Sequence, residues 1–492
     1  MKKKILLIGI ALLILTSFSG CDLAPKFRSP NVILPTKKEF PLAKEKETLK
    51  WGWWKSFNDP VLNKLIDKAL KNNTDLLIAA TKVEQLIALA GFRKAQLYPL
   101  LGYKAQVSRT KIPENIENQI EGIGKTFSSL PIPGAAAFSF NLENPKTSYN
   151  IVGSVSYELD FWGKLRNAKK AALARVLAAK AMQDTIKISL VSGIANLYFN
   201  LVGISKELEV AKRLKDVLKK IYEIQKKQWK LGLVNKILVC QAKSNYEELK
   251  GLIKNLEEKK KELEATLAYL VGETPRELFS KRELDLGKAK LPKGLKVPGM
   301  LPSQLLLNRP DIILAEEQLK AANFDVGVAK AAYFPDINLT GYTGSLSSKF
   351  SDLMKSSSIF WSIGSGIVGP IFTFGRIKSQ VKLMEAKKKE ALLNYIKTVR
   401  NAFKEVYTGL IKISYSKKQL RIQENKLSVL KEAYDIRKGL YENGLSNELE
   451  VLILRANYLK QRLQVIQTKV RLISNYIYLY KALGGGIYLA NK

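Results

Sequence analysis

Apolar side chains recur along this chain with two different periods. Over residues 60–97, and again in the long stretch that begins at Lys164, they fall three or four positions apart, which is typical of a helix with one buried face. Over residues 147–161 they occupy every second position, which is typical of a half-buried strand. The sequence therefore predicts long helices that alternate with short β-hairpins, and the first hairpin falls within residues 100–162.

The second half of the chain repeats the first. Residues 72–99 align with residues 308–335 at an offset of 236, and a later block aligns at an offset of 212. The first half is longer by 236 − 212 = 24 residues, which fall in a Gly/Pro-rich loop of the first hairpin. Identical pairs include Asn72/Asn308, Asp75/Asp311, Gly91/Gly327, Gly163/Gly375, Gly232/Gly444, Asn235/Asn447 and Gly272/Gly484. Because each half holds the same elements, the second hairpin is expected within residues 335–374.

The longest helices follow the hairpins. Residues 164–231 and 376–443 each run for 68 positions without proline, and each would be about 100 Å long as a helix. A turn near Gly232 or Gly444 then leads into a shorter return helix, which leaves half of each long helix without a neighbour. The helices that precede the hairpins have the missing length and are expected to stack end to end with the return helices. The predicted fold class is mainly α with a small β part: a tandem-duplicated unit that gives a long antiparallel helical assembly and four strands.

The first 20 residues predict an export signal. Lysines at positions 2 to 4 precede the apolar run Ile5–Leu15, which is too short to span a bilayer, and small residues follow it. Cys21 comes next, and this order resembles the lipobox of bacterial lipoproteins, although Phe18 stands where leucine is usual. Cys21 is therefore the candidate lipidation site, and an ordinary signal peptide with an incidental cysteine stays open. The other cysteine, Cys240, is expected to be a small packing residue.

Composition argues against several classes of function. The 492 residues contain 81 Lys and Arg against 44 Asp and Glu, and a net charge of +37 ordinarily suggests a nucleic-acid partner. An exported protein does not meet chromosomal DNA, and the lysines are spread along helical faces, so we expect solvated faces and no nucleic acid. The chain has no histidine, which removes the commonest general base and transition-metal ligand. We therefore expect no catalytic residue, no metal site, no cofactor and no enzymatic activity.

Four strands per chain set a requirement on assembly. After the signal, no segment has 18 consecutive apolar residues, so no transmembrane helix is expected. The smallest membrane barrels have about eight strands, and an open sheet edge cannot lie in lipid. Three chains would supply enough strands to close a barrel. The alternative, a periplasmic coiled coil with small exposed hairpins, needs no such closure.

Five blocks around the duplication resemble the outer membrane factor family, the TolC-like trimeric exit ducts of tripartite efflux and type I secretion systems. The resemblance covers nearly the whole chain and points to the lipoprotein subgroup that serves resistance-nodulation-division pumps. The blocks are WKSFNDPVLNKLIDKALKNNTDL (54–76), YELDFWGKLRNA (157–168), LNRPDIILAEEQLKAANFDVGVAKAAYFP (307–335), GPIFTFGRI (369–377) and LYKALGGG (479–486).

The resemblance implies an architecture and a function. Each protomer of a homotrimer would give four strands to a twelve-stranded transmembrane β-barrel in the outer membrane, and its helices to a helical barrel through the periplasm. The duct would conduct substrates passively from an inner-membrane pump and a periplasmic adaptor protein, with outer-membrane lipid as a further partner. The helical tips would dock the adaptor, against the alternative of plain interhelical turns. The candidate docking residues are Leu231, Gly232, Leu233, Val234, Gly444, Leu445 and Ser446.

The chain departs from the family pattern at the periplasmic gate. Family members often carry an aspartate nine residues past the second tip glycine, where this chain has Ile453. Glu448 and Glu450 lie nearby, and three copies of either would form a ring of like charges that raises their pKa and favours cations. Glu448, Glu450 and Ile453 are therefore the gate candidates, against the alternative of solvated glutamates on a helix.

These expectations divide the chain and leave two rival functions. The predicted segments are a signal peptide (1–20), a lipid-anchored extended segment (21–59), the first repeat (60–272), a linker (273–302), the second repeat (303–486) and a tail (487–492). The rivals are a type I protein-secretion duct and a structural coiled-coil lipoprotein. Asp22 resembles the residue that retains lipoproteins in the inner membrane of enteric bacteria, whereas the hairpins favour the outer membrane.

Overall fold

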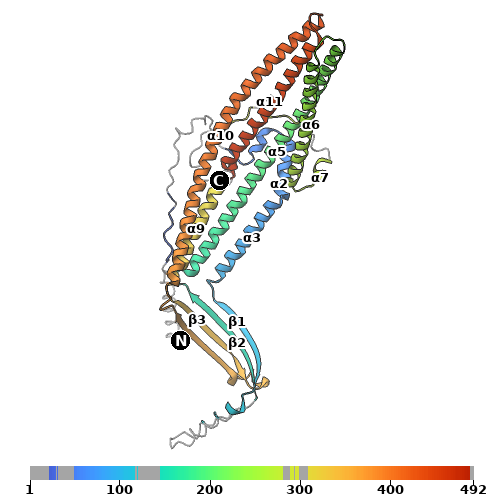
Figure 1. Ribbon diagram of the computed structural model, residues 1–492. Coiled ribbons are helices and arrows are strands. Elements are labelled where there is room, and N and C mark those ends of the chain that lie inside the picture. Colours follow the sequence, from blue (N-terminus) through green and yellow to red (C-terminus); the bar gives the residue numbers. More distant parts are fainter. Residues whose placement is uncertain are drawn as a thin grey trace, which may run out of the picture. The chain divides into compact units, whose positions relative to one another are not determined.

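The computed structural model describes residues 22–28, 30, 49–116, 119, 123, 145–280, 289–292, 294–297 and 309–487. The predicted signal segment, Cys21 and the tail beyond residue 487 lie outside the described residues. The main helices are α2 (Pro60–Asn72), α3 (Thr74–Ala95), α5 (Lys164–Lys230), α6 (Lys236–Val271), α7 (Pro275–Ser280), α9 (Pro310–Ala331), α10 (Arg376–Glu442) and α11 (Glu448–Ala482) (Figure 1). The strands are β1 (Leu100–Thr110), β2 (Lys146–Leu159), β3 (Asp336–Ser347) and β4 (Ile359–Val368), and a short 3-10 helix, η2 (Trp53–Phe57), precedes α2.

Both halves of the chain follow one order of elements, so the duplicated, mainly α fold with four strands is confirmed. The order α3-β1-β2-α5-α6 of the first half returns as α9-β3-β4-α10-α11 in the second. One prediction is wrong: residues 60–97 are not a single helix, because α2 ends at Asn72 and α3 begins at Thr74. Asn73 between them has an extended backbone (φ −65°, ψ 122°), and its side-chain oxygen accepts a hydrogen bond from the backbone N–H of Leu76 at 3.1 Å, which caps α3.

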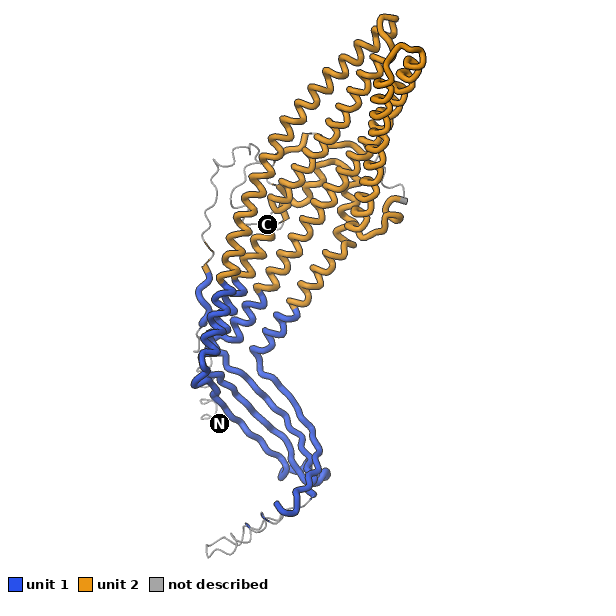
Figure 2. Tube along the Cα trace, viewed as in Figure 1, with its two compact units in different colours: residues 1–27, 88–173, 320–388 blue, residues 28–87, 174–319, 389–492 orange. Residues whose placement is uncertain are grey.

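The chain forms two compact units (Figure 2). Unit 1 consists of Met1–Phe27, Ala88–Leu173 and Lys320–Lys388. It contains the four strands and the adjoining ends of α3, α5, α9 and α10. Unit 2 consists of Arg28–Ile87, Ala174–Leu319 and Lys389–Lys492. It contains α2, α6, α7, α11 and the rest of the four helices that also enter unit 1.

In unit 1 the strands form one antiparallel sheet in the order β1-β2-β3-β4. Strand β2 pairs with β3 across the two repeats, from Tyr149 opposite Ser347 to Leu159 opposite Ile337. The alternation predicted over residues 147–161 therefore belongs to a central strand. Strands β1 and β4 pair on one side only, so each leaves a row of backbone N–H and C=O groups unpaired along an edge of the sheet.

The turn from β2 into α5 is held by charged side chains of the block YELDFWGKLRNA. Asp160 accepts a hydrogen bond from the backbone N–H of Leu165 at 3.0 Å, which caps the first turn of α5. Lys164 forms ion pairs with Glu158 and Asp336, each at 2.9 Å. Because Glu158 lies on β2 and Asp336 begins β3, these ion pairs tie the start of α5 to both central strands.

One buried cluster of unit 2 is rich in aromatic rings. The ring of Phe57 on η2 packs against the rings of Trp53 and Phe199, with centroids 5.9 and 5.0 Å apart. Asp59 caps α2 and also accepts a hydrogen bond from the hydroxyl of Tyr198 at 2.7 Å. Burial and the neighbouring carboxylate of Asp59 raise the pKa of Tyr198 above its usual range, so this hydroxyl remains a hydrogen-bond donor.

A second buried cluster of unit 2 joins α5, α6 and α11. The apolar positions three or four apart that the sequence predicts after Lys164 contribute to it, since Leu208 and Ala211 are 8% and 0% exposed. Helix α10 takes no part in this cluster: between Lys417 and Glu442, where every residue is described, none of its side chains is buried. The outer half of α10 therefore has a surface that lacks a packing partner within one chain.

Among the described residues, α5 contains an 18-residue window that is apolar enough to cross a membrane by length and composition. In the structure, 67% of that window is buried by other parts of the protein. Burial on this scale is what the core helix of a folded domain shows, so packing explains the apolar stretch.

The two repeats make the same contact where a return helix ends. The side-chain amide of Asn73 donates to the carbonyl oxygen of Leu270 at 3.0 Å, and the guanidinium of Arg309 donates to that of Ala482 at 2.6 Å. These positions are equivalent, since 73 + 236 = 309 and 270 + 212 = 482. The expected end-to-end stacking thus occurs in both repeats. Arg309 is buried and also forms an ion pair with Glu405 of α10 at 2.8 Å.

Arg309→Ala is expected to lower the thermal unfolding midpoint more than Asn73→Ala. Loss of the guanidinium leaves the half-buried carboxylate of Glu405 without its cation, which typically costs on the order of 3 kcal/mol, whereas Asn73→Ala removes neutral hydrogen bonds worth about 1–2 kcal/mol. Circular dichroism melting of the two purified variants checks the order. Equal midpoints would contradict the role given to the ion pair.

Candidate functional site

The register of the sheet separates its side chains into two faces. Residues that lie opposite each other across the strands point to the same face. One face carries rows such as Leu101–Val155–Gly341–Ile363 and Tyr103–Gly153–Thr343–Trp361. The other carries rows such as Gly102–Ser154–Tyr342–Ser362 and Leu100–Ser156–Thr340–Gly364. The first face is mainly apolar, and the second is mainly small or polar.

A single chain leaves the apolar face in contact with solvent. Leu101, Trp361 and Ile363 are 77%, 73% and 82% exposed. The strands are 10 to 14 residues long, which is sufficient for tilted strands to cross the hydrocarbon core of a bilayer. Apolar and polar residues that alternate along strands of this length are the pattern of a membrane β-sheet with one face toward lipid and one toward water.

The candidate docking residues lie on two turns of the same geometry at one end of unit 2 (Figure 1). Gly232 and Gly444 have φ angles of 76° and 78°, a region that favours glycine. The backbone N–H of the next residue reaches the carbonyl five positions earlier in each turn, which is the Schellman motif. Leu231, Leu233 and Leu445 on these turns are 72%, 70% and 74% exposed, while Val234 and Ser446 are half-buried.

Glu450 is held by neighbours on its own chain. One of its carboxylate oxygens accepts a hydrogen bond from Nη1 of Arg437 at 2.7 Å, and the other accepts one from the side-chain amide of Asn447 at 3.1 Å. The side-chain oxygen of Asn447 accepts in return from the backbone N–H of Glu450 at 3.0 Å, so Asn447 caps α11. Glu448 and Ile453, the other gate candidates, are exposed on α11.

Arg437 is a residue that the sequence analysis missed. The first repeat has Gln225 and Leu238 at the positions equivalent to Arg437 and Glu450. The ion pair therefore belongs to the second tip, where the hydroxyl of Ser446 also donates to Glu450 at 3.0 Å. A position-by-position comparison of the two repeats would have found this difference in charge.

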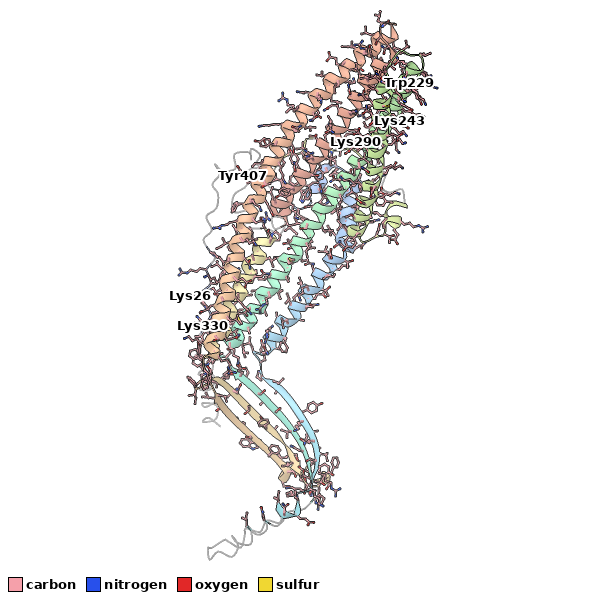
Figure 3. All side chains as sticks on the ribbon, in the orientation of Figure 1. Lys26, Trp229, Lys243, Lys290, Lys330 and Tyr407 are labelled. Carbon is pink, nitrogen blue, oxygen red and sulfur yellow. The ribbon has the colours of Figure 1, made fainter. Side chains whose placement is uncertain are left out.

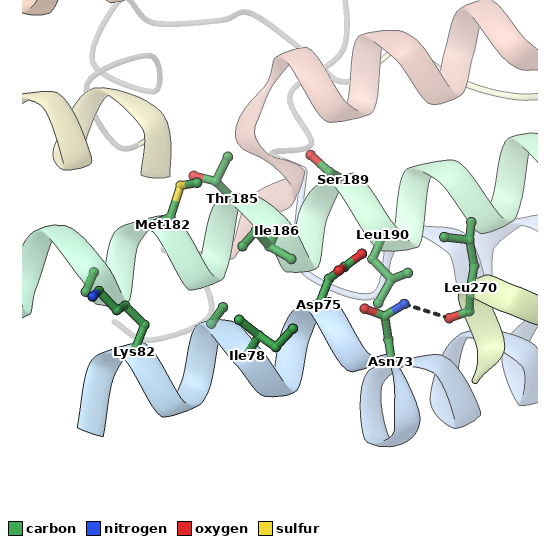
Figure 4. Close-up of a pocket in the computed structure, with 12 residues that line it drawn as sticks. Asn73, Asp75, Ile78, Lys82, Met182, Thr185, Ile186, Ser189, Leu190 and Leu270 are labelled. Atoms are coloured by element: carbon green, nitrogen blue, oxygen red, sulfur yellow. Dashed lines mark hydrogen bonds between the residues drawn. The ribbon is translucent and has the colours of Figure 1, made fainter. Parts of the chain in front are cut away.

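An apolar groove of about 780 Å³ lies between α3 and α5 in unit 2 (Figure 4). Ile78 and Met182, which line it, are 62% and 45% exposed. Asn73, bonded to the carbonyl of Leu270, lies at one end of the view. The lining is mainly apolar and open to solvent, which is typical of a surface that receives another helix rather than of an enclosed ligand site.

Charges and possible metal ligands do not gather into a site. Lysine side chains project along the helices, as at Lys243 and Lys330 (Figure 3). Several pair with acids one helical turn away, such as Lys438 with Glu442 at 3.2 Å. Within the parts of the chain that the structure describes, no group of three His, Cys, Asp or Glu could hold a metal ion. Cys240 is exposed on α6, so the prediction that it packs is wrong within a single chain.

Comparisons with known proteins agree with this geometry. The family model for outer membrane efflux proteins matches residues 65–273 and 301–485. The "Solvent efflux pump outer membrane protein SrpC" of Pseudomonas putida is 30% identical over 484 residues, which cover 96% of this chain and 97% of SrpC. The "Probable outer membrane lipoprotein SilC" of Salmonella typhimurium is 30% identical over 476 residues, which cover 95% and 96%. The crystal structure of the Campylobacter jejuni CmeC outer membrane channel is similar with a TM-score of 0.79 and 28% identity, covering 95% of both chains.

The family model extends over both repeats, and it leaves out η2, the start of α2 and α7. The two matched ranges contain the long helices and all four strands, and the relatives have nearly the same length as this chain. The chain belongs to the outer membrane efflux protein family, and it is an outer-membrane exit duct of a tripartite efflux system.

Proposed function

We propose that three copies of this chain form one duct, which conducts substrates passively from an inner-membrane pump, through a periplasmic adaptor protein, to the cell exterior. The observation that carries the proposal is the four-stranded sheet with an apolar face and two unpaired edges. Twelve strands are enough to close a barrel, and closure pairs the edge groups that lipid cannot solvate. On this proposal the chain performs no catalysis, because passive conduction requires a continuous channel lining and no reacting group.

The internal duplication supports assembly by a second argument. On α5, Val210 and Val217 are buried among residues of α6 and α11, and a Cβ placed on Gly203 would overlap Val470 of α11. The equivalent seam on α10 is exposed. Its residues are Tyr415, Ile422, Val429 and Ile436, with exposed fractions of 68%, 60%, 63% and 59%. A heptad seam of this kind is typically covered by another helix.

The helix that covers this seam in the proposed trimer is α6 of the next copy. Helix α11 presents one line of buried residues, Leu452, Ala456, Leu459, Leu463, Ile466 and Val470. The equivalent residues on α6 are all exposed: Cys240, Ser244, Glu247, Gly251, Lys254 and Glu258. Within one chain α5 and α11 run antiparallel, with Gly203 against Val470. The same register is applied to α10 and α6 of the next copy by adding 212 to each α5 number and subtracting 212 from each α11 number. It puts Ile422 opposite Gly251 of the next copy. It also puts Lys426 opposite Glu247, so a large side chain faces a small one and a base faces an acid.

Ala433→Cys is expected to form a disulfide with the native Cys240 of a neighbouring copy. Residue 433 lies opposite residue 240 in the transferred register, so mild oxidation of the purified protein should give a covalent trimer on non-reducing gels. Lys431→Cys, two positions away on another face of α10, is the matched control and should stay monomeric on the gel. Monomers from both variants would contradict the interface between α6 and α10.

The exposed leucines at the two tips form the docking surface for the adaptor protein. Leu231, Leu233 and Leu445 are apolar side chains on the two turns, and charged residues such as Lys230 and Glu442 are exposed beside them. Isolated apolar patches with a polar rim mark sites of protein–protein interaction. Gly232 and Gly444 then serve the turn itself, whereas the leucines supply the contact.

Glu450 holds the second tip closed through its bonds to Arg437 and Asn447. The ion pair links α10 to α11, and the first tip has neutral residues at the equivalent positions. Movement of α10 away from α11 must break this ion pair, so the second hairpin resists opening more than the first. The gate is therefore a bond within each protomer, in place of the free ring of carboxylates that the sequence suggested.

Glu450→Ala is expected to raise the resting conductance of the purified protein in planar bilayers about tenfold. The variant loses a half-exposed ion pair with Arg437 and the hydrogen bonds that Asn447 and Ser446 donate to the carboxylate, which together are worth roughly 1–2 kcal/mol in favour of the closed tip. Glu448→Ala, in the same turn of α11, is the matched control and should conduct like the wild type. A rise for Glu448→Ala alone would move the gate to Glu448, and a wild-type protein without channel activity would contradict the duct.

Cys21 supplies a lipid anchor to this assembly. Support comes from the lipobox-like order of the residues around it and from the description of SilC as a lipoprotein. The description of SrpC as part of a solvent efflux pump favours small exported molecules over the protein substrates of a type I secretion duct.

A further inference from the structure

Residues 22–27, here called the strap, begin against the first turns of α5 in unit 1. The carboxylate of Asp22 accepts hydrogen bonds from the side-chain amide of Asn167 at 2.8 Å and from Nζ of Lys170 at 2.7 Å. It also accepts one from the backbone N–H of Ala24 at 3.1 Å. Partial burial alone would raise the pKa of Asp22, but these bonds more than offset it, so the pKa is lowered and the carboxylate is charged at neutral pH.

Helix α9 receives the rest of the strap. The side-chain amide of Asn323, which is 1% exposed, donates to the carbonyl oxygen of Pro25 at 2.7 Å. The amine of Lys320 lies 5.6 Å from the ring centroid of Phe27, within the range of a cation–π contact. The strap is therefore bonded to α5 at its first residue and to α9 further along.

Gly327 on α9 makes room for the strap. A Cβ on residue 327 would come within 2.8 Å of the Cβ of Ala24 and 2.9 Å of the amide nitrogen of Asn167, closer than real Cβ contacts. The first repeat offers an internal comparison, because a Cβ on the equivalent Gly91 would meet no atom within 4 Å. The strap and the side chain of Asn167 that binds it, and not the backbone of α9, are what require glycine at position 327.

We propose that Asp22 is a positioning residue that fixes the start of the exported chain at one height on unit 1. Asn167 and Lys170 are three and six residues past Lys164, so they lie about 5 and 9 Å along α5 from its first residue. This gives Asp22 a role in the folded protein that is separate from lipoprotein sorting.

The clamp also deepens the proposed function, on which this second part rests. The clamp holds Asp22, the residue after the candidate lipidation site, at the level where β2 ends and α5 begins, which is where a membrane-spanning sheet leaves the bilayer. The lipid would then fix how deeply the barrel inserts in the membrane, because the segment that joins it to the barrel is bonded to α5 and α9. The clamp itself stands whether or not Cys21 carries a lipid.

Trypsin cleavage after Lys26 tests the clamp. Lys26 is exposed (Figure 3), but its backbone lies in the docked strap, so cleavage of native protein requires the strap to leave α5 and α9. Asp22→Ala removes the acceptor, and Gly327→Ala inserts a methyl group beneath the strap. Each should raise the rate of cleavage after Lys26 about tenfold, because that rate follows the population of undocked strap. Mass spectrometry of the full chain purified in detergent gives the rate at this one bond.

Three further variants separate docking from general damage to the fold. Gly91→Ala, the matched control in the first repeat, and Lys169→Met, next to the clamp on α5, should be cleaved after Lys26 at the wild-type rate. Lys170→Met should be cleaved as fast as Asp22→Ala, and it tests the clamp even if Gly327→Ala fails to fold.

Wild-type cleavage rates in Asp22→Ala and Lys170→Met would overturn the inference. It would also be overturned if Asp22→Ala changed only the membrane fraction in which the protein is recovered, because that result assigns Asp22 to sorting. Conductance is not measured in this experiment. The cleavage result can therefore be interpreted even if the duct proposal fails, so the two proposals are tested independently.

Discussion

The unpaired edges of the four-stranded sheet are the constraint on which the rest of the structure depends. Lipid offers no hydrogen bonds to the outer sides of β1 and β4, and the apolar face of the sheet is unfavourable in water. One chain cannot satisfy both demands, whereas a closed ring of copies can. Helices α5 and α10 begin within a few residues of β2 and β4, so a ring of strands also brings the helices of neighbouring copies together. Outside the membrane, the exposed seam on α10 and the exposed face of α6 also need a neighbouring copy to cover them.

The duplication shows how one scaffold acquires two different halves. Equivalent positions hold Asn73 or Arg309 at the joint of the return helix, and Leu238 or Glu450 at the tip. In both places the neutral residue belongs to the first repeat and the charged residue to the second. The buried ion pair of Arg309 resists separation of the helices more strongly than the neutral bonds of Asn73, and the half-exposed ion pair of Glu450 has no counterpart at the first tip. The second hairpin is therefore the more restrained of the two, although both share one backbone design.

Much of the fold was predictable because the spacing of apolar residues along the chain reflects which face of each helix or strand is buried. The 68 proline-free positions from Lys164 correspond to α5, which ends at Lys230, and the alternation after Lys146 corresponds to β2. The break at Asn73 was missed because the apolar period continues through it, although an asparagine there is a local signal for the start of a helix. Only its second bond, to the carbonyl of Leu270, joins positions 197 apart. Cys240 was misjudged for a related reason, since a small apolar residue on a helix has the same pattern whether or not a second copy covers it.

The sequence by itself determined the features that local chemistry controls. These are the duplicated order of elements, the glycines with positive φ at both tips, and the asparagine caps that start α6 and α11. The tertiary structure alone decided which charges meet. Glu450 finds Arg437 on the preceding helix, Arg309 finds Glu405 on α10, and Asp22 finds α5. A cap or a period depends on residues within one turn, whereas an ion pair between segments depends on the register in which those segments pack.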